Sequence, residues 1–402
     1  MDYKNDNQHY ADNRTVIIGI DASNIRGGGG VTHLVELLQA ADPLLHGFSE
    51  IILWGGEATL SKIEGRSWLV KTHIQSLDNN LIYRSLWQRF KLSNAVRAAG
   101  CDVLFVPGGV FAGDFHPIVT MNRNLLPFEL NEFLRYGLSW MTFKMLLLRW
   151  LQSRTLRKAE SVIFLTQYAQ KLVNKIARLN PVKSTTVPHG VNNRFQSMPR
   201  TQLAIQDYSF NRPFRIVYIS VVDKYKHQWH VVNAVAKLRA SGLPVVLELV
   251  GPSHSSPLSK LKRIMEKVDP NSRYIHYLGS VTYEAIQDIY ASADLNVFAS
   301  SCEAFGQILV EAMSAGLPIA CSNRSSMPEV LGNAGLYFDP ENPDDIAKAL
   351  RKLIESPELR SQKAKLAFDR AQEYTWHRCA FETFGVLTKT TQFYRSNTQC
   401  KK

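Results

Sequence analysis

The sequence predicts two α/β domains, each built around a parallel β-sheet. The chain has 402 residues, which is too long for one simple core and fits two domains of ordinary size. Its 45% apolar and 20% charged residues are typical of a globular protein. Residues 293–321 read as strand, loop, helix, turn and strand, and such a βαβ unit indicates parallel strands.

The first domain is expected over residues 14–195. Apolar runs predict its strands at 15–21, 51–54, 103–106 and 161–166, and its helices at about 31–40, 81–99 and 167–179. The polar stretch 195–212 is the predicted linker. The second domain is expected over residues 213–375, with strands at 214–220, 245–250, 275–281, 293–299 and 319–321.

Four consecutive glycines, residues 27–30, follow the first predicted strand and precede a helix. They allow the backbone to approach a ligand closely, and the helix start adds N–H groups beside them. We therefore take Gly28, Gly29 and Gly30 as candidate ligand-binding residues, with a flexible turn as the alternative. The run lacks the G-x-G-x-x-G spacing and the later acid of a dinucleotide-binding fingerprint.

The stretch 300–320 carries the clearest functional pattern. Gly306 opens a helix at the carboxyl edge of the second sheet, and the N–H groups of Phe305, Gly306 and Gln307 predict an anion site for a phosphate. Glu303 precedes the helix and Glu311 lies inside it, on the order of 10 Å away at 1.5 Å per helical residue. Since a carboxylate pair in a double-displacement hydrolase lies about 5 Å apart, we expect these acids to hold two ends of one ligand.

Together, Glu303, Glu311 and the sequence E-A-M-S-A-G-L-P at 311–318 resemble the donor-site signature of a known family. These are the retaining, nucleotide-sugar-dependent glycosyltransferases of the GT-B fold, family 4 (glycosyltransferase group 1). The resemblance implies two Rossmann-like domains facing a central cleft, with the first binding the acceptor and the second the nucleotide sugar. It implies that Glu303 contacts the transferred sugar, that Glu311 holds the ribose and that the intervening N–H groups face the diphosphate.

The resemblance extends to other segments. It implies that the glycine-rich loop lies over the donor phosphates and the acceptor, and that a last helix, 376–395, crosses back to the first domain. The turn at 188–191 is similar to the one that closes the first domain in this family, so His189 is interpreted as a turn residue. No D-x-D sequence stands between strand and turn. We expect no metal and no cofactor besides the nucleotide-sugar substrate.

Two positions depart from the family pattern. The family has an arginine about five residues before a lysine on the diphosphate; Lys226 matches the lysine, Val221 replaces the arginine, and Lys224 is expected to compensate. Many members have a histidine near the reacting sugar, where this chain has Asn122. An amide can hydrogen-bond a sugar hydroxyl but cannot accept a proton at neutral pH.

Residues 132–158 mix large apolar side chains with arginine and lysine, and the whole chain has a net charge of +12. This segment is predicted to be a basic amphipathic surface on the inner leaflet of a membrane, with a buried core helix as the alternative. No run of 18 apolar residues predicts a spanning helix, and the first thirteen residues are polar. We therefore expect a cytoplasmic, peripheral membrane protein whose five scattered cysteines are reduced.

The predicted function is that of a retaining hexosyltransferase. It would transfer mannose or a similar hexose to a lipid-linked or polysaccharide acceptor in the biosynthesis of a cell-surface polysaccharide, such as O-antigen or exopolysaccharide. A GT-B nucleotide-sugar epimerase, a basic non-enzymatic nucleic-acid-binding protein and a structural interaction protein are the alternatives. We expect no nucleic-acid partner, because the basic charge comes without a recognition motif.

Overall fold

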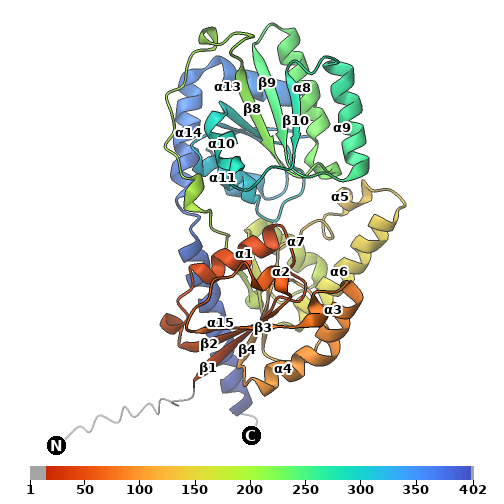
Figure 1. Ribbon diagram of the computed structural model, residues 1–402, viewed down its shortest axis with the longest axis vertical. Coiled ribbons are helices and arrows are strands. Elements are labelled where there is room, and N and C mark those ends of the chain that lie inside the picture. The colour runs from red at the N-terminus through yellow and green to blue at the C-terminus, as the bar shows by residue number, and fades with distance from the viewer. Residues whose placement is uncertain (1–14, 400–402) are drawn as a thin grey trace, which may run out of the picture.

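The computed structural model describes residues 15–399, in two α/β domains that lie one above the other along the long axis of the molecule (Figure 1). The polar lead of residues 1–13 and Cys400 lie outside the described residues. The four described cysteines are buried and form no disulfide. They are Cys101, Cys302, Cys321 and Cys379.

The N-terminal domain contains a seven-stranded parallel sheet with the order β3-β2-β1-β4-β5-β6-β7. Its strands are β1 (Val16–Asp21), β2 (Phe48–Gly55), β3 (Leu69–His73), β4 (Val103–Val106), β5 (Ile118–Asn122), β6 (Ser161–Phe164) and β7 (Ser184–Thr186). The strand order reverses between β1 and β4, so the loops after these strands open a crevice at the carboxyl edge of the sheet. The edge strands β3 and β7 are not predicted from the sequence, because both are short and partly polar.

The helices of this domain are α1 (Gly29–Gln39), α2 (Glu57–Leu60), α3 (Leu81–Trp87), α4 (Ser93–Ala98), α5 (Leu130–Leu134), α6 (Trp140–Lys158) and α7 (Gln167–Ala177). The predicted helix 81–99 is two helices joined by a π-helical turn at Gln88–Leu92. The segment 132–158 is also divided, because Gly137 adopts a positive φ of 65° and Ser139 caps α6 by accepting a hydrogen bond from the Thr142 N–H.

The C-terminal domain repeats this architecture with a six-stranded parallel sheet of order β10-β9-β8-β11-β12-β13. Its strands are β8 (Phe214–Ile219), β9 (Val245–Val250), β10 (Ile275–Gly279), β11 (Leu295–Phe298), β12 (Ile319–Ser322) and β13 (Gly335–Phe338). Its helices are α8 (Gln228–Ala240), α9 (Ser255–Val268), α10 (Ala285–Ser292), α11 (Gln307–Ser314), α12 (Met327–Leu331), α13 (Pro343–Glu355) and α14 (Pro357–Ala371). The strand order reverses between β8 and β11, where the second crevice opens. The predicted fold class, two Rossmann-like domains, is confirmed.

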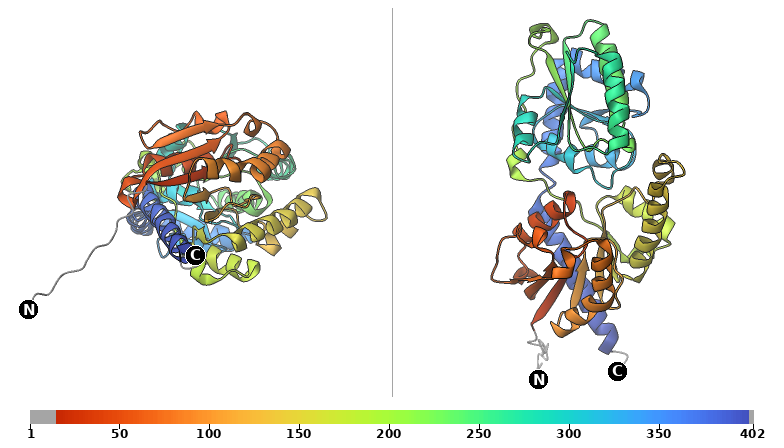
Figure 2. Two further views of the ribbon diagram at one scale, coloured as in Figure 1. Left: turned by 90° about the horizontal axis from the view of Figure 1, so that it is seen from below. Right: turned by 45° about the vertical axis from the view of Figure 1, so that its right-hand side comes forward.

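Two segments that cross between the domains touch each other. The turn at Gly190 packs so closely on the start of α15 (Trp376–Gln399) that a Cβ at Gly190 would lie 2.2 Å from the Trp376 nitrogen. The Val191 N–H donates to the Tyr374 carbonyl at 2.9 Å. The helix α15 then descends along the N-terminal domain (Figures 1 and 2), where it contacts α1 and β4. The last helix thus connects the C-terminal domain to the N-terminal domain and packs on the latter.

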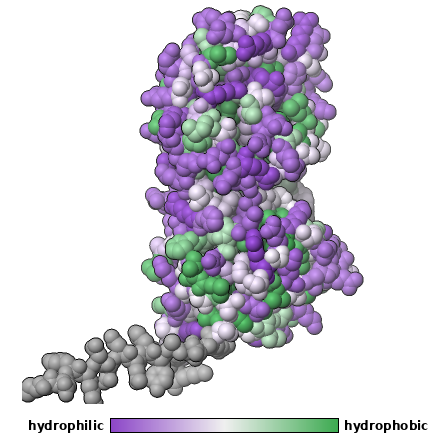
Figure 3. Space-filling model, turned by 60° about the vertical axis from the view of Figure 1, so that its left-hand side comes forward, coloured by the Kyte–Doolittle hydropathy of each residue, from purple (hydrophilic) through white to green (hydrophobic). Residues whose placement is uncertain are grey.

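Exposed large apolar side chains gather on the N-terminal domain. On the face seen in Figure 3, apolar residues cluster over the lower domain, whereas the upper, C-terminal domain is mostly hydrophilic. The helices α3 and α6, on the same side of the N-terminal domain (Figures 1 and 2), carry many of the exposed apolar residues, including Leu81, Ile82, Trp140, Phe143 and Trp150. Within residues 15–399, no helix combines the length and apolar character needed to cross a membrane.

Candidate functional site

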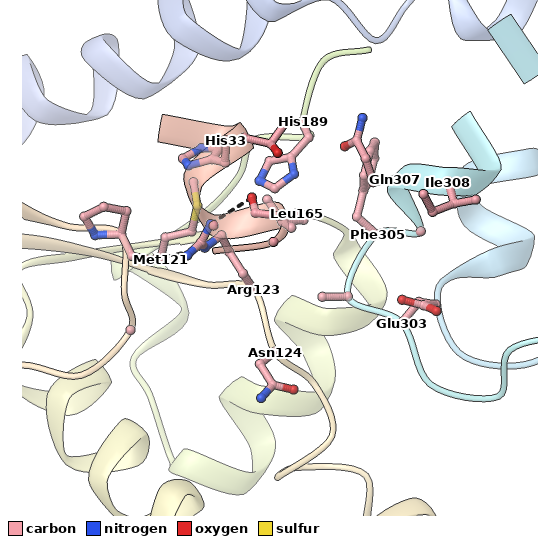
Figure 4. A pocket seen from close by; sticks show the side chains of 18 of the residues that line it. His33, Met121, Arg123, Asn124, Leu165, His189, Glu303, Phe305, Gln307 and Ile308 are labelled. Atoms are coloured by element: carbon pink, nitrogen blue, oxygen red, sulfur yellow. Dashed lines mark hydrogen bonds between the residues drawn. The ribbon is translucent and has the colours of Figure 1, made fainter. Parts of the chain in front are cut away.

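The carboxyl edges of the two sheets face each other across a cavity of about 620 Å³. Both domains line it (Figure 4). The glycine-rich loop after β1, the loop after β4 and the residues after β5 form the N-terminal wall, and the β11–α11 loop forms the C-terminal wall. This is the location where open α/β sheets bind ligands.

The C-terminal wall presents the start of α11. Gly306 adopts a left-handed conformation with φ 85°, and α11 begins at the next residue, as predicted. A Cβ at Gly306 would lie 2.7 Å from Met327 Cε, so a side chain at this position would be strained and crowded. Phe305, Gly306, Gln307 and Ile308 all line the cavity. The first N–H groups of a helix have no partner within it, so this wall is suited to an anion.

An ion pair lies beside this helix start. The ammonium of Lys226, in the loop after β8, donates to the carboxylate of Glu303, in the loop after β11. Lys226 is buried and also lies 5.3 Å from the ring centroid of Phe298. The hydroxyls of Ser325 and Ser326 donate to the Glu303 carbonyl at 3.0 and 2.7 Å. These contacts hold the acid at the cavity wall and bring together two candidate residues that are 77 positions apart.

Glu311 lines the cavity from inside α11 and is 2% exposed. Burial raises the pKa of this carboxyl from 4.5 to about 8, and the Arg194 guanidinium opposes the rise. Its Oε2 atom is buried and has no hydrogen-bond partner among the described residues. Glu311 is therefore largely protonated at neutral pH without a ligand, and its carboxyl group can both donate and accept a hydrogen bond.

The contribution of Glu311 to the free energy of unfolding of the ligand-free protein should fall as the pH rises from about 5 to 8. The raised pKa of Glu311 means that the folded state holds a proton that the unfolded chain releases, so stability is lost through this range. The loss is at most about 1.4 kcal/mol per pH unit. Glu311→Gln, which cannot ionise, should lack this contribution, so its free energy of unfolding relative to that of the wild-type protein should rise with pH in chemical denaturation at pH 5–9. The same pH dependence in both proteins would contradict the raised pKa.

The N-terminal wall contains the predicted glycines and residues that the prediction omits. Gly28, Gly29 and Gly30 line the cavity, and α1 begins within them, two residues earlier than expected. Arg123, directly after β5, lies beside His33 and His189 (Figure 4). The rings of the two histidines stack with centroids 4.5 Å apart. Burial lowers the pKa of His189 to about 3 and that of His33 well below its usual value, with nearby Arg123 adding to both shifts.

Two candidate residues, Lys224 and Asn122, do not line this cavity. The ammonium of Lys224 donates to the Arg135 carbonyl at 3.0 Å and lines a separate hollow with Trp229 and Lys260. Asn122 is 1% exposed and does not line the cavity, whereas the residues on either side of it do. The structure therefore brings Glu303, Lys226, Glu311, the helix start and the glycine loop together, and leaves Lys224 and Asn122 outside.

Arg123, His33 and the position of His189 in the cavity are not predicted from the sequence. Arg123 had a usable signal, because it stands just after the largely apolar run at 118–121, which lies in β5 and ends at the carboxyl edge of the sheet. His33 had none, since it occupies an ordinary helical position. Among residues 15–399, no group of three or more histidine, cysteine, aspartate or glutamate side chains is arranged to hold a metal ion.

Residues 202–369 match the family "Glycosyl transferases group 1". Over 113 residues the chain is 36% identical to O-antigen chain mannosyltransferase B of Escherichia coli, covering 28% of this chain and 30% of that protein. Over 247 residues it is 26% identical to a GDP-mannose-dependent alpha-(1-6)-phosphatidylinositol dimannoside mannosyltransferase of Mycobacterium tuberculosis, covering 60% of this chain and 61% of that protein. The chain thus matches less than two thirds of the length of either relative.

Solved structures are similar in fold to nearly the whole chain. HepE of Anabaena, solved with UDP and glucose, superposes with a TM-score of 0.67 at 16% identity, covering 93% of this chain and all of that one. At this identity the likeness concerns the fold. The stretch matched by the family contains the whole C-terminal sheet and α11. This chain accordingly has the GT-B fold, and its residues 202–369 are similar to the glycosyl transferases group 1 family.

Proposed function

We propose that the protein is a retaining glycosyltransferase that moves mannose or a similar hexose from a nucleoside-diphosphate sugar to a lipid-linked or saccharide acceptor. The observation that carries this proposal is the cavity between the domains. The start of α11, Glu303 and Glu311 line it at one sheet edge, Lys226 pairs with Glu303 from behind, and Oε2 of the buried Glu311 has no hydrogen-bond partner among the described residues. The hexose is proposed from the two mannosyltransferases to which the chain is similar.

In this proposal the donor lies along the C-terminal wall. The diphosphate accepts hydrogen bonds from N–H groups at the start of α11, and Lys226 offsets the charge that grows on the leaving diphosphate. The carboxyl group of Glu311 pairs with the ribose hydroxyls, and Glu303 contacts the transferred sugar. The donor is the nucleotide sugar itself, without an additional cofactor.

The proposed transfer retains the configuration of the sugar. Glu303 and Glu311 are the carboxylate residues among the described residues that line the cavity, and Glu303 is engaged by Lys226. Neither is free to act as a nucleophile below the sugar. We propose instead that an oxygen of the leaving phosphate takes the proton of the acceptor hydroxyl. The bond from C1 to the phosphate breaks, and the new C1–O bond forms on the same face.

Donor screening tests this function. Purified protein should gain thermal stability with GDP-mannose or with a UDP-hexose, because a ligand that binds only the folded state raises the unfolding temperature. NMR of the product with the selected donor should give the anomeric configuration of the donor. No shift with any nucleotide sugar would contradict the proposal. Conversion of the nucleotide sugar to an epimer without an acceptor would favour the epimerase alternative.

We propose further that α6 brings the enzyme to a membrane-borne acceptor. Trp140, Phe143 and Trp150 are more than half exposed on this helix, and the Arg154 guanidinium lies 5.9 Å from the ring centroid of Trp150. Its last turn adds Arg157 and Lys158. Exposed aromatic rings beside cationic side chains suit the interface of an anionic membrane. Met145 and Leu156 are buried, so the helix also packs on its own domain.

Reversing the charge of Lys144, Arg154 and Lys158 to glutamate should release the protein from anionic vesicles. Each cation near such a surface contributes about 1 kcal/mol, so removing three should weaken binding at least ~100-fold. Sedimentation with phosphatidylglycerol vesicles measures the effect. The matched control reverses three exposed lysines of the C-terminal domain, Lys267, Lys348 and Lys352, and should still sediment. Equal sedimentation of both triple variants would contradict a docking role for α6.

A further inference from the structure

Arg123 is a half-buried cation that neutral groups hold in place. Its Nε atom donates to the Pro107 carbonyl at 3.1 Å, and its Nη1 atom donates to the Gly29 carbonyl at 3.4 Å. The guanidinium also packs on Gly30, where a Cβ would lie 3.1 Å from Nη2. The two carbonyls orient the guanidinium plane, and no described carboxylate lies beside it as a counter-ion.

Partial burial lowers the pKa of Arg123 to about 10, and no acid among the described residues opposes this shift. Keeping a cation away from water without an anion is costly, so such groups are normally paired. Arg123 lines the cavity, where a ligand can supply the missing charge. It is also the one lysine or arginine among the described residues that line this cavity.

The groups around Arg123 favour an anion as well. His33 is buried with both ring nitrogens lacking a hydrogen-bond partner among the described residues, and the same holds for Nε2 of His189. Across the cavity lie Phe305 and Gln307 at the start of α11 (Figure 4). The cavity therefore offers hydrogen-bond donors from both walls.

The C-terminal wall alone supplies little free positive charge. Lys226 is already paired with Glu303, and Lys224 lines another hollow. A nucleoside diphosphate bound at α11 would carry more negative charge than these groups neutralise. We infer that Arg123 binds the diphosphate of the donor from the N-terminal side of the cavity, so that both domains hold the donor. This inference rests on the function proposed above.

The test compares diphosphate binding with monophosphate binding. Calorimetry with GDP, UDP, GMP and UMP should show that Arg123→Gln weakens binding of the preferred diphosphate by 10-fold or more, while the matching monophosphate loses much less. The diphosphate affinity of Arg123→Lys should lie between those of the wild-type protein and Arg123→Gln. The control is Arg66→Gln, which removes an exposed arginine of the same domain that does not line the cavity and should bind both nucleotides as wild type does.

A second variant leaves the arginine in the chain. Gly30→Ala should fold like the wild-type protein, because Gly30 lies in the first turn of α1 and has no positive φ. Its Cβ should displace the guanidinium and weaken diphosphate binding, though less than Arg123→Gln does. Thermal unfolding of all variants identifies any loss that comes from misfolding.

Three outcomes would overturn the inference. Unchanged diphosphate affinity in folded Arg123→Gln would show that the guanidinium does not contact the donor. Unchanged diphosphate affinity with a raised KM for the acceptor would assign the anion to the acceptor instead. If the wild-type protein binds neither diphosphate, the proposed function fails and the inference fails with it.

Discussion

Lys226→Ala should lower kcat roughly 100- to 1000-fold, which is the usual cost of removing one group that stabilises transition-state charge. Donor affinity should fall much less, because the negative charge on the diphosphate is greatest when the bond to the sugar breaks. Steady-state kinetics with the selected donor, together with calorimetry, separates the two effects. An unchanged kcat of Lys226→Ala would show that Lys226 takes no part in the reaction.

The interpretation of this variant depends on Glu303, which Lys226 pairs with in the ligand-free protein. Removing the lysine leaves the carboxylate without its cation, so Glu303→Ala and the double variant should be measured alongside. If the two residues act as a unit, the fold-loss in kcat of the double variant should be smaller than the product of the fold-losses of the two single variants. Lys224→Ala is the matched control from the same loop, and it should turn over near the wild-type rate because Lys224 lines a separate hollow.

Glu311→Ala should weaken nucleotide-sugar binding by about 1–3 kcal/mol, because the ribose hydroxyls would lose their partner in a closed site. The matched control is Glu311→Gln, which can still donate and accept hydrogen bonds. At pH 7 this variant should weaken nucleotide-sugar binding less than the alanine variant does, because the raised pKa already keeps Glu311 largely protonated. Calorimetry with the nucleotide sugar measures both variants. Wild-type affinity in Glu311→Ala would remove this residue from the donor site.

Local sequence is enough to place the helix start at the site. Gly306 ends a loop and begins α11 because it tolerates a positive φ, and the strand before it fixes this turn at the sheet's carboxyl edge. The parallel topology places the glycines at 28–30 at the matching edge of the other sheet. These features depend on neighbouring residues and on the general rules of α/β folds, so the sequence predicts them.

The two lysines of the β8 loop illustrate what local pattern leaves open. Lys224 and Lys226 stand at the ends of a short 3₁₀ turn, Lys224–Lys226. With three residues per turn, the side chains of positions two apart point in directions about 120° apart. One ammonium therefore reaches Glu303 and the other reaches the Arg135 carbonyl. Sequence spacing could nominate both but could not choose between them without the turn geometry.

The sequence by itself determined the two-domain α/β fold, the loop-to-helix turn at Gly306 and the positions of Glu303 and Glu311 beside it, because each follows from short-range pattern. Only the tertiary structure decided that Lys226 meets Glu303, that Asn122 lies beneath the cavity surface, and that Arg123 and His33 line it. Those outcomes depend on how two sheets and their loops pack across the domain interface. Burial and pairing between distant residues are set by that packing, which no local sequence pattern encodes.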